Sequence, residues 1–402
     1  MSDGAPILPG ATIGFLGGGQ LGRMTAFAAR SMGYDVAVLD PDPACPMGPV
    51  ASRVITAPYS DADAAVELAR ACDVVTLEIE QIPRPTLEAV AAVVPLRPGV
   101  EPVWIIQDRG RQKEWLRDQG FPVGPFRTVT SEEACVRAAG ELGPSIVKSC
   151  FGGYDGRGQA RVTGAGDAAE GWRAVGAERC VVEAFLDIRH ELSVLVARRP
   201  DGACEVFPPA RNHHAHGVLA WSVTPTSLPE RVEREARAIG RAIAESLGIV
   251  GLVAVELFLL ADGRLLVNEL APRPHNTFHS TERACDTSQF EQLVRAICAL
   301  PLGRTAINRP AAIANLLGDL WEPAAPRFTD ALREPSARLH LYGKSAARPG
   351  RKMGHLSATG GTPHEALTCV LDAYDALGGA PAERVDAPDV SAGGTPLPSD
   401  VE

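Results

Sequence analysis

Aromatic residues make up only 5% of this 402-residue chain, which argues against the aromatic stacking platforms that bind single-stranded nucleic acids. The formal net charge of −10 argues against a nucleic-acid-binding surface. The nine cysteines form no C-x-x-C pair, which favours reduced thiols. No apolar run approaches the roughly 18–20 residues of a membrane span, and the N-terminus lacks a signal-peptide pattern. These absences predict a cytoplasmic globular protein of two or three domains that binds neither nucleic acid nor membrane.

The segment from Lys148 to Gln159, KSCFGGYDGRGQ, carries the first functional signal. It follows a short apolar strand at 145–148 and contains four glycines. Glycines let backbone N–H groups approach phosphate oxygens, and the lysine supplies a charge for the same phosphates. No Gly-Lys-Ser/Thr closes the loop, so it is not a Walker A motif. A phosphate-binding loop and a mobile surface hairpin both fit this segment.

The first hundred residues alternate strand and helix. Strands are expected at 12–16, 36–39 and 74–77, with helices from about 23 to 32 and from about 61 to 71. This order predicts a parallel sheet with crossover helices.

A glycine pattern after the first strand, Gly17-x-Gly19-x-x-Gly22, matches the dinucleotide fingerprint, and Asp40 lies near the place of the ribose-binding acid. These features would suit a nicotinamide-dependent oxidoreductase. A tight strand-to-helix turn needs the same glycines. Glu78 and Glu80 follow the third strand, either as ligand-binding groups or as a solvated strand end.

The rest of the chain has a different organisation. A proline-rich crossing at 98–103 precedes an expected helix at 107–119 and a linker at 120–125. A small α/β unit follows, and then a strand-rich region with one long helix at 229–247. Its other expected strands are 191–197, 205–208, 219–224, 251–259 and 265–269.

Two carboxylates on the last pair of strands carry the second signal. Glu256 and Glu269 interrupt apolar strands, and buried carboxylates need partners. Oxygen ligands across a hairpin suit Mg²⁺ or Mn²⁺, although neutralisation by Arg or Lys is the alternative. The segment 271–276, APRPHN, adds a cation, an imidazole and an amide. A basic run at 342–355 could bind a second phosphate or form a solvated turn.

These features together resemble the ATP-grasp fold, and more closely the N5-carboxyaminoimidazole ribonucleotide synthase family of purine biosynthesis. The resemblance runs from about residue 11 to residue 375. The motifs that carry it are GGGQLGRM at 17–24, QDR at 107–109, GGYDGRGQ at 152–159, NELAPRPHN at 268–276, TSQFEQ at 287–292 and RPGRKMGH at 348–355.

The resemblance implies a mixed α/β and α+β architecture. Its parts are a Rossmann-like pre-ATP-grasp domain at 1–122, a lid at 123–186, a mixed-sheet catalytic domain at 187–385 and a disordered tail at 386–402. It also implies a homodimer.

The resemblance further implies the roles of individual residues. ATP would be bound by Arg109, Lys148, Gly153, Tyr154, Asp155, Gly156, Arg157, Gly158, Gln159, Glu183, Ala184, Phe185, Leu186, Glu191, His214, Asn268 and Glu269. The aminoimidazole ribonucleotide would be bound by Gln20, Leu21, Glu78, Tyr154, Asp155, Lys344 and Arg351. Magnesium would be held by Glu256 and Glu269, and the catalytic residues would be Arg273, His275, Asn276 and Asp155.

The implied reaction is ATP-dependent carboxylation of an amine. ATP phosphorylates bicarbonate to carboxyphosphate, and the amine then captures the carboxyl group or the released carbon dioxide. Positioning and charge neutralisation drive the phosphoryl transfer, and a closing lid protects carboxyphosphate from water. Asp155 and His275 are both candidates for the amine proton.

The chain departs from the family pattern at three places. Phe278 stands where the family usually has glycine, residues 77–81 read LEIEQ, and residues 187–190 read DIRH. These departures leave the identity of the acceptor open, so a specialised ligase acting on another, phosphorylated amine is an alternative. A non-catalytic nucleotide-binding protein is a third.

Overall fold

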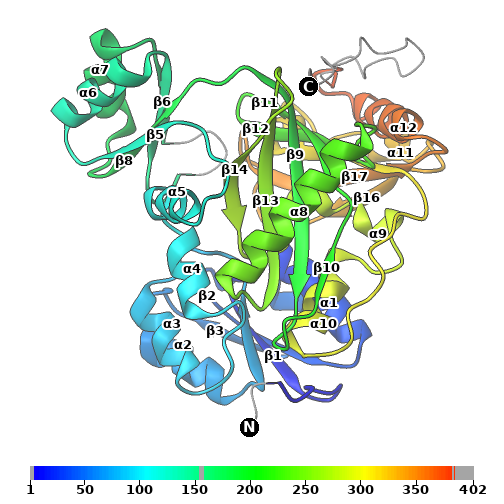
Figure 1. The fold of residues 1–402 in the computed structure, drawn as a ribbon. Coiled ribbons are helices and arrows are strands. Elements are labelled where there is room, and N and C mark those ends of the chain that lie inside the picture. Colours follow the sequence, from blue (N-terminus) through cyan, green and yellow to red (C-terminus); the bar gives the residue numbers. More distant parts are fainter. Residues whose placement is uncertain (1–3, 154–157, 383, 385–402) are drawn as a thin grey trace.

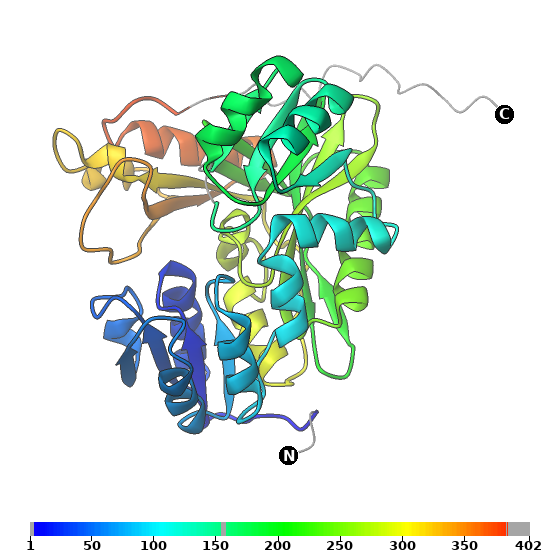
Figure 2. The same cartoon turned by 90° about the vertical axis from the view of Figure 1, so that its left-hand side faces the viewer.

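The computed structural model describes residues 4–153, 158–382 and 384. Three β-sheets follow one another along the chain. The N-terminal sheet lies at one end of the molecule and the small sheet at the opposite end, with the largest sheet between and beside them (Figure 1 and Figure 2). Predicted tail residues 386–402 lie outside the described residues.

The N-terminal sheet is four-stranded and wholly parallel, in the order β3-β2-β1-β4, as the alternation of strand and helix predicted. Its central strands are buried and apolar, as in parallel sheets covered on both faces. β3 was not predicted, because this short edge strand reads RVIT and is largely exposed. The elements are β1 (Thr12–Leu16), α1 (Gln20–Ser31), β2 (Asp35–Asp40), η1 (Gly48–Val50), β3 (Arg53–Thr56), α2 (Ala62–Arg70), β4 (Val74–Leu77) and α3 (Arg84–Ala91).

Two helices replace the single helix predicted after the proline-rich crossing. α4 (Val100–Ile106) forms in what was predicted to be the crossing, because Pro102 lies in its first turn, where a missing N–H costs nothing. α5 (Arg109–Asp118) begins two residues later than predicted. The Asp108 carboxylate caps it by accepting from the backbone N–H of Arg111 at 2.8 Å.

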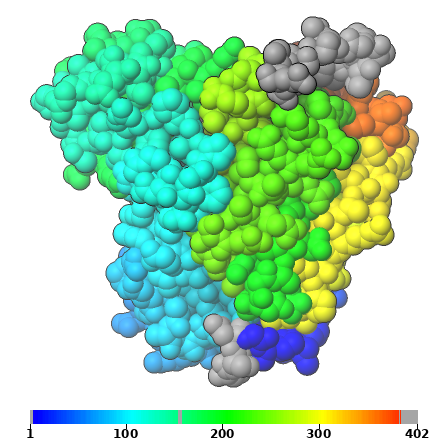
Figure 3. All heavy atoms as spheres, in the orientation of Figure 1, coloured from blue at the N-terminus to red at the C-terminus, as the bar shows by residue number. Residues whose placement is uncertain are grey.

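The second sheet forms a small unit that projects from the body of the molecule (Figure 1 and Figure 3). It is antiparallel, in the order β5-β8-β6-β7, and two helices pack against it over an apolar core. The glycine-rich segment joins β6 to β7, so it lies at a hairpin end of this unit. The elements are β5 (Phe126–Val129), α6 (Glu132–Leu142), β6 (Ser145–Ser149), β7 (Gln159–Val162), α7 (Ala165–Val175) and β8 (Cys180–Ala184).

The third sheet has nine strands, in the order β14-β13-β9-β11-β12-β15-β17-β16, with β10 paired to β9. Helix α8 packs across β9 and β13, and α12 packs on β15 and β17 (Figure 1). β11 was not predicted, because its sequence ARNHHA is polar. The strands are β9 (Ile188–Arg198), β10 (Cys204–Val206), β11 (Ala210–Ala215), β12 (Val218–Thr224), β13 (Gly251–Leu260), β14 (Leu265–Ala271), β15 (Ala311–Leu317), β16 (Arg338–Leu341) and β17 (Lys352–Thr359).

The helices of this region complete the described structure. They are α8 (Glu230–Leu247), η2 (Asn276–Phe278), α9 (Thr281–Ala284), α10 (Gln289–Ile297), η3 (Gly318–Trp321), α11 (Phe328–Ala331) and α12 (Pro363–Asp375). Among the described residues, no helix combines the length and the apolar character that a membrane span requires. The domain boundaries at residues 122 and 186 stay predictions.

Candidate active site

The glycine loop between β1 and α1 binds carboxylates of the protein itself. Gly18 N–H donates to Asp40 at 2.7 Å, while Gly19 N–H and Leu21 N–H donate to Glu78 at 2.9 and 3.3 Å. A Cβ on Gly19 would lie 2.4 Å from a Glu78 oxygen, so packing against this carboxylate requires glycine. These N–H groups are the ones that a dinucleotide would need. The nicotinamide interpretation of this loop is therefore wrong.

Glu80 is likewise not a solvated strand end. Its two carboxylate oxygens accept from Nε and Nη2 of Arg273 at 2.6 and 3.1 Å, and both side chains are mostly buried. Burial alone would raise the pKa of Glu80, but the Arg273 guanidinium holds it below its ordinary value. The pair fixes Arg273, a predicted catalytic residue, against the N-terminal unit.

The two predicted metal carboxylates face each other across the β13–β14 hairpin. Glu256 pairs with Glu269 in the register, whereas Leu257 pairs with Val267, so Asn268 is the extra residue of a β-bulge. Asn268 Nδ2 donates to Glu256 at 3.2 Å. The bulge thus explains how adjacent residues Asn268 and Glu269 both serve one site, although neighbouring strand residues normally point to opposite faces.

The surroundings of the two carboxylates differ. His275 Nε2 lies 3.2 Å from Glu256, and Arg109 Nη2 lies 3.6 Å from Glu269. Burial would raise the pKa of Glu256, but His275 and other neighbours lower it to about 2. Burial raises the pKa of Glu269, and the Glu256 charge adds to this effect against the opposing pull of Arg109. Two partly buried acids, with side chains 22% and 41% exposed and a raised pKa at Glu269, form a site suited to a divalent cation.

Three charged side chains meet where β6, β8 and α5 approach one another. Glu183 accepts from Lys148 Nζ at 3.1 Å, and Lys113 Nζ lies 3.5 Å from the same oxygen. Burial would raise the pKa of Glu183, but the two ammonium groups lower it to about 2. The sequence placed Lys113 on a charged helix without a site role. Lys113 lies four residues after Arg109 and therefore on the same helix face, and this spacing could have indicated that both side chains reach one site.

Arg109 connects Glu269, one of the two predicted metal carboxylates, to the glycine-rich segment. Its guanidinium donates to the backbone carbonyls of Ser149 and Gly153 at 3.2 and 2.6 Å. The predicted ligands Tyr154, Asp155, Gly156 and Arg157 lie outside the described residues. Gly158 has a φ of +67° and Gln159 pairs with Lys148 in the register, which brings the end of the segment back to the lysine.

The predicted nucleotide hinge joins β8 to β9. Ala184 N–H and Phe185 N–H donate to the carbonyls of Pro125 and Pro144, and the Phe185 ring is 49% exposed, with Leu186 following it. Glu191 on β9 and His214 on the neighbouring β11 form an ion pair. Burial lowers the pKa of His214, but Glu191 outweighs burial and raises it.

A chain of hydrogen bonds joins two residues predicted to bind the acceptor substrate, Lys344 and Gln20, to the predicted catalytic residue Asn276. Lys344 Nζ donates to Gln20 Oε1 at 2.9 Å, and Gln20 Nε2 donates to Asn276 Oδ1 at 2.8 Å. His279 Nε2 also lies 3.0 Å from Asn276 Oδ1. Arg351, predicted to act with Lys344, donates to the carbonyl of Ala346 at 2.8 Å. The chain brings Lys344, Gln20 and Asn276 together, while no described contact joins Arg351 to them.

Gln289 supports this segment and was missed as a site residue. It accepts from the backbone N–H of His275 at 2.8 Å and donates to the His275 carbonyl at 3.0 Å. It also lies 3.1 Å from His279 Nδ1. Gln289 is fully buried at the start of α10. The motif TSQFEQ at 287–292 signalled this position without revealing its function.

The departure at Phe278 lies away from the reacting groups. Its ring is 1% exposed and packs against Phe207, with ring centroids 6.3 Å apart, in a core shared by the N-terminal and large sheets. The bulky side chain therefore fills the core rather than the site.

The sequence comparisons match all three parts of the chain. Residues 10–107 match the ribonucleotide synthetase preATP-grasp domain, residues 114–290 the ATP-grasp domain, and residues 311–368 the phosphoribosylaminoimidazole carboxylase C-terminal domain. The N5-carboxyaminoimidazole ribonucleotide synthase of Bacillus subtilis is 40% identical over 352 residues, covering 87% of this chain and 92% of that protein. The chain belongs to the N5-carboxyaminoimidazole ribonucleotide synthase family. The Brucella melitensis synthase is 40% identical over 358 residues, covering 88% of this chain and 98% of that protein.

Solved structures of the family have the same fold. An ADP complex of an N5-carboxyaminoimidazole ribonucleotide synthetase has a TM-score of 0.88 and 40% identity, covering 93% of this chain and 98% of that one. The Aspergillus clavatus synthase, in complex with ADP and 5-aminoimidazole ribonucleotide, has a TM-score of 0.84 and 32% identity, covering 91% of this chain and 98% of that one. The predicted ATP-grasp ligase family and fold are thereby confirmed. The roles of individual residues stay predictions.

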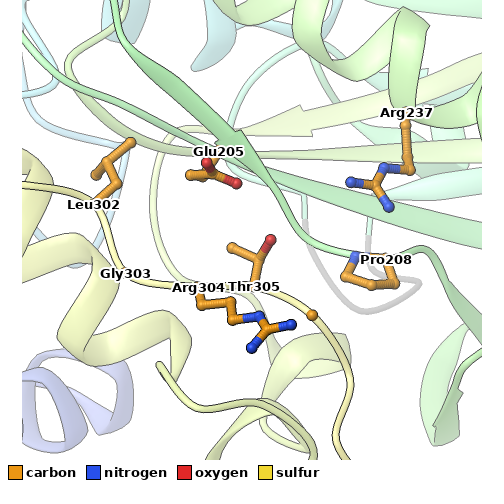
Figure 4. Close-up of a pocket in the computed structure, with 8 residues that line it drawn as sticks. Glu205, Pro208, Arg237, Leu302, Gly303, Arg304 and Thr305 are labelled. Carbon is orange, nitrogen blue, oxygen red and sulfur yellow. The ribbon is translucent and has the colours of Figure 1, made fainter.

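A hollow of about 420 Å³ lies elsewhere, between β10, α8 and the segment at 302–306 (Figure 4). Arg237 and Arg304 reach it from different elements. Arg237 and Thr305 both donate to the carbonyl of Val206 at 3.1 Å, so these side chains serve the local fold. The hollow shares none of its lining residues with the site described above.

Proposed function

We propose that this protein carboxylates 5-aminoimidazole ribonucleotide to N5-carboxyaminoimidazole ribonucleotide, consuming ATP and bicarbonate and releasing ADP and phosphate. The observation that carries the proposal is the hydrogen-bonded chain Lys344–Gln20–Asn276, which links a cation suited to the acceptor phosphate with the catalytic segment. The names of the relatives and the aminoimidazole ribonucleotide complex of the Aspergillus synthase support the same acceptor.

The first step transfers the γ-phosphoryl group of ATP to a bicarbonate oxygen. The new P–O bond forms as the bond to the ADP oxygen breaks, giving ADP and carboxyphosphate. Lys148 and Arg109 are placed to neutralise the phosphate charge, and Arg273, held at Nε and Nη2 by Glu80, is oriented to bind the carboxyphosphate.

The residues present fit Mg²⁺. Glu256 and Glu269 offer oxygen ligands from facing strand positions. Burial and the Glu256 charge raise the pKa of Glu269, an effect that a bound cation would offset. They would hold the ion, with Asn268 orienting Glu256. When bound, Mg²⁺ supplies charge neutralisation for the transferring phosphoryl group.

In the second step the acceptor amine forms a C–N bond to the carboxyl carbon, the C–O bond to phosphate breaks, and the amine loses a proton. His275 is held between Glu256 and Thr277, whose Oγ1 lies 2.8 Å from its Nδ1. His275 and Asp155 are both candidates for the proton. Assembly as a homodimer is proposed from the family resemblance.

The test is ADP formation measured with Mg²⁺, ATP, bicarbonate and aminoimidazole ribonucleotide, omitting each in turn. We expect full activity only with all four. A rate of ADP formation that does not depend on the ribonucleotide but rises with another phosphorylated amine would favour the specialised ligase. Nucleotide binding without turnover would favour a binding protein.

Lys344→Ala tests the placement of the acceptor. Loss of the cation is expected to raise the KM for aminoimidazole ribonucleotide about tenfold or more, with the KM for ATP little changed. An unchanged acceptor KM would show that Lys344 does not bind its phosphate.

A further inference from the structure

Three side chains from separate segments converge beside the large sheet, outside the set assigned to ATP and acceptor. Glu282 comes from α9, His340 from β16 and His355 from β17, where the two histidines face each other in the register. One ligand atom from each lies within 4.8 Å of the other two. The grouping therefore depends on tertiary structure, and no spacing of these residues in the sequence reveals it.

Each of these three atoms is buried without a hydrogen-bond partner among the described residues. They are Glu282 Oε2, His340 Nε2 and His355 Nε2. The first two lie 3.7 Å apart, which is too long for a hydrogen bond. Buried polar atoms without partners are costly and rare, so three at one point indicate a missing ligand, either an ion or a water molecule.

The chemistry of the three atoms favours a cation. Two imidazole nitrogens and one carboxylate oxygen form a donor set that is typical of Zn²⁺ with one open position. Tyr342 OH lies 2.9 Å from His355 Nδ1, and a hydrogen bond at this nitrogen would hold the ring with Nε2 directed at an ion. Burial lowers the pKa of His340 to about 4 and that of His355 well below its ordinary value, which favours the neutral form of both rings.

We propose that Glu282, His340 and His355 bind Zn²⁺ or a similar transition-metal dication, at a site separate from Glu256 and Glu269. The His340 and His355 rings are stacked, with centroids 4.5 Å apart and planes within 7°, so one ring must turn to aim at a shared ion. His340 is the ring with more freedom to turn, because its side chain is 22% exposed, whereas His355 is fully buried between His340 and His279.

The ion would join α9 to the β16–β17 pair. The connection between these two strands carries Lys344 and Arg351, so the site would brace the segment proposed to bind the acceptor phosphate. Arg283 and Arg338 act electrostatically on Glu282 and His340, and their charges reduce the affinity for a cation. The site is therefore expected to bind zinc less tightly than a fully enclosed structural zinc site.

The test is a titration of the metal-depleted, full-length protein with Zn²⁺, followed by calorimetry, in the presence of excess Mg²⁺. Wild type is compared with Glu282→Gln and His340→Gln. His364→Gln, which alters an exposed histidine on α12, is the matched control. Glu256→Gln reports any zinc bound at the ATP site. Circular dichroism establishes that each variant is folded.

Wild type, His364→Gln and Glu256→Gln are expected to share a class of zinc site that Glu282→Gln and His340→Gln both lack. Zinc should also raise the Tm of wild type more than that of Glu282→Gln. Equal zinc stoichiometry and affinity in wild type, Glu282→Gln and His340→Gln would overturn the proposal and assign the gap to a water molecule. His340→Gln replaces a partly exposed side chain with one of similar polarity, so it decides the question even if Glu282→Gln fails to fold.

Discussion

Glu80 and Arg273 lie 193 positions apart in the sequence, yet their side chains form a two-point ion pair with distances of 2.6 and 3.1 Å. The side chains are 14% and 21% exposed. The pair joins the segment after β4 to the segment after β14, so the N-terminal unit helps to position Arg273, the predicted catalytic cation.

Breaking this pair is expected to impair both stability and turnover. Glu80→Ala and Arg273→Ala should each lower the free energy of unfolding by about 3–5 kcal/mol, because the remaining partner stays buried and unpaired. The double variant should lose less than the sum. Urea unfolding and kcat of all three variants measure these effects. Glu291→Ala, which breaks the helical pair of Glu291 with Arg295, is the control and should cost only about 0.5 kcal/mol.

Gln289 and Gln292 provide a matched comparison on one helix. Each is buried and bonds both backbone groups of one residue, Gln289 those of His275 and Gln292 those of Gly303. Gln289→Leu and Gln292→Leu should both lower stability by about 1–3 kcal/mol, because buried backbone groups lose their partners. Only Gln289→Leu is expected to lower kcat strongly after correction for unfolded protein. Equal kcat losses in the two variants would contradict a positioning role for Gln289.

Glu269→Gln should change stability and activity in opposite directions: the metal-free protein becomes more stable while the enzyme becomes less active. The raised pKa of Glu269, caused by burial and by Glu256, means that its charge is unfavourable without a cation. The neutral isostere should therefore raise the Tm measured without Mg²⁺, while ADP formation falls about 100-fold or more. A lower Tm would show that the pair with Arg109 outweighs the repulsion.

The ion pairs of Glu183 with Lys148 and Lys113 should make the free energy of unfolding depend on pH in the acid range. The pKa of Glu183 is about 2 in the folded protein and about 4.5 ordinarily, so its carboxylate stabilises the fold above about pH 4.5. This contribution, about 3 kcal/mol, should disappear as the pH falls from about 4.5 towards 2. Unfolding free energies of Glu183→Gln should depend less on pH in this window than those of wild type. The exposed control Glu245→Gln should keep the wild-type dependence.

The sequence predicted the elements whose patterns are local. The apolar strands of the N-terminal sheet, the long helix α8 and the β13–β14 hairpin were expected within a few residues of their bounds. β11 was missed because its sequence ARNHHA is polar, although Arg211 and Asn212 are buried in the structure. α4 was missed because residues 98–103 were predicted to be a proline-rich crossing, although the first turn of a helix tolerates proline.

Residue types in the site were predictable, but their pairings were not. The carboxylates Asp40 and Glu78 matched ligand-binding positions in the sequence, yet both bind the backbone of the glycine loop. The roles of Glu80, Gln289 and Lys113 depend on contacts between distant segments, which periodicity and spacing do not encode. The β-bulge at Asn268 is a register shift that the sequence of one strand cannot reveal.

The most direct test of the account follows ¹³C-bicarbonate in the presence of ATP, Mg²⁺ and aminoimidazole ribonucleotide. The account predicts a ¹³C-labelled N-carboxylated ribonucleotide in NMR spectra, formed in equal amount to ADP and absent when ATP or the ribonucleotide is omitted. ADP release without incorporation of label into the ribonucleotide would contradict it.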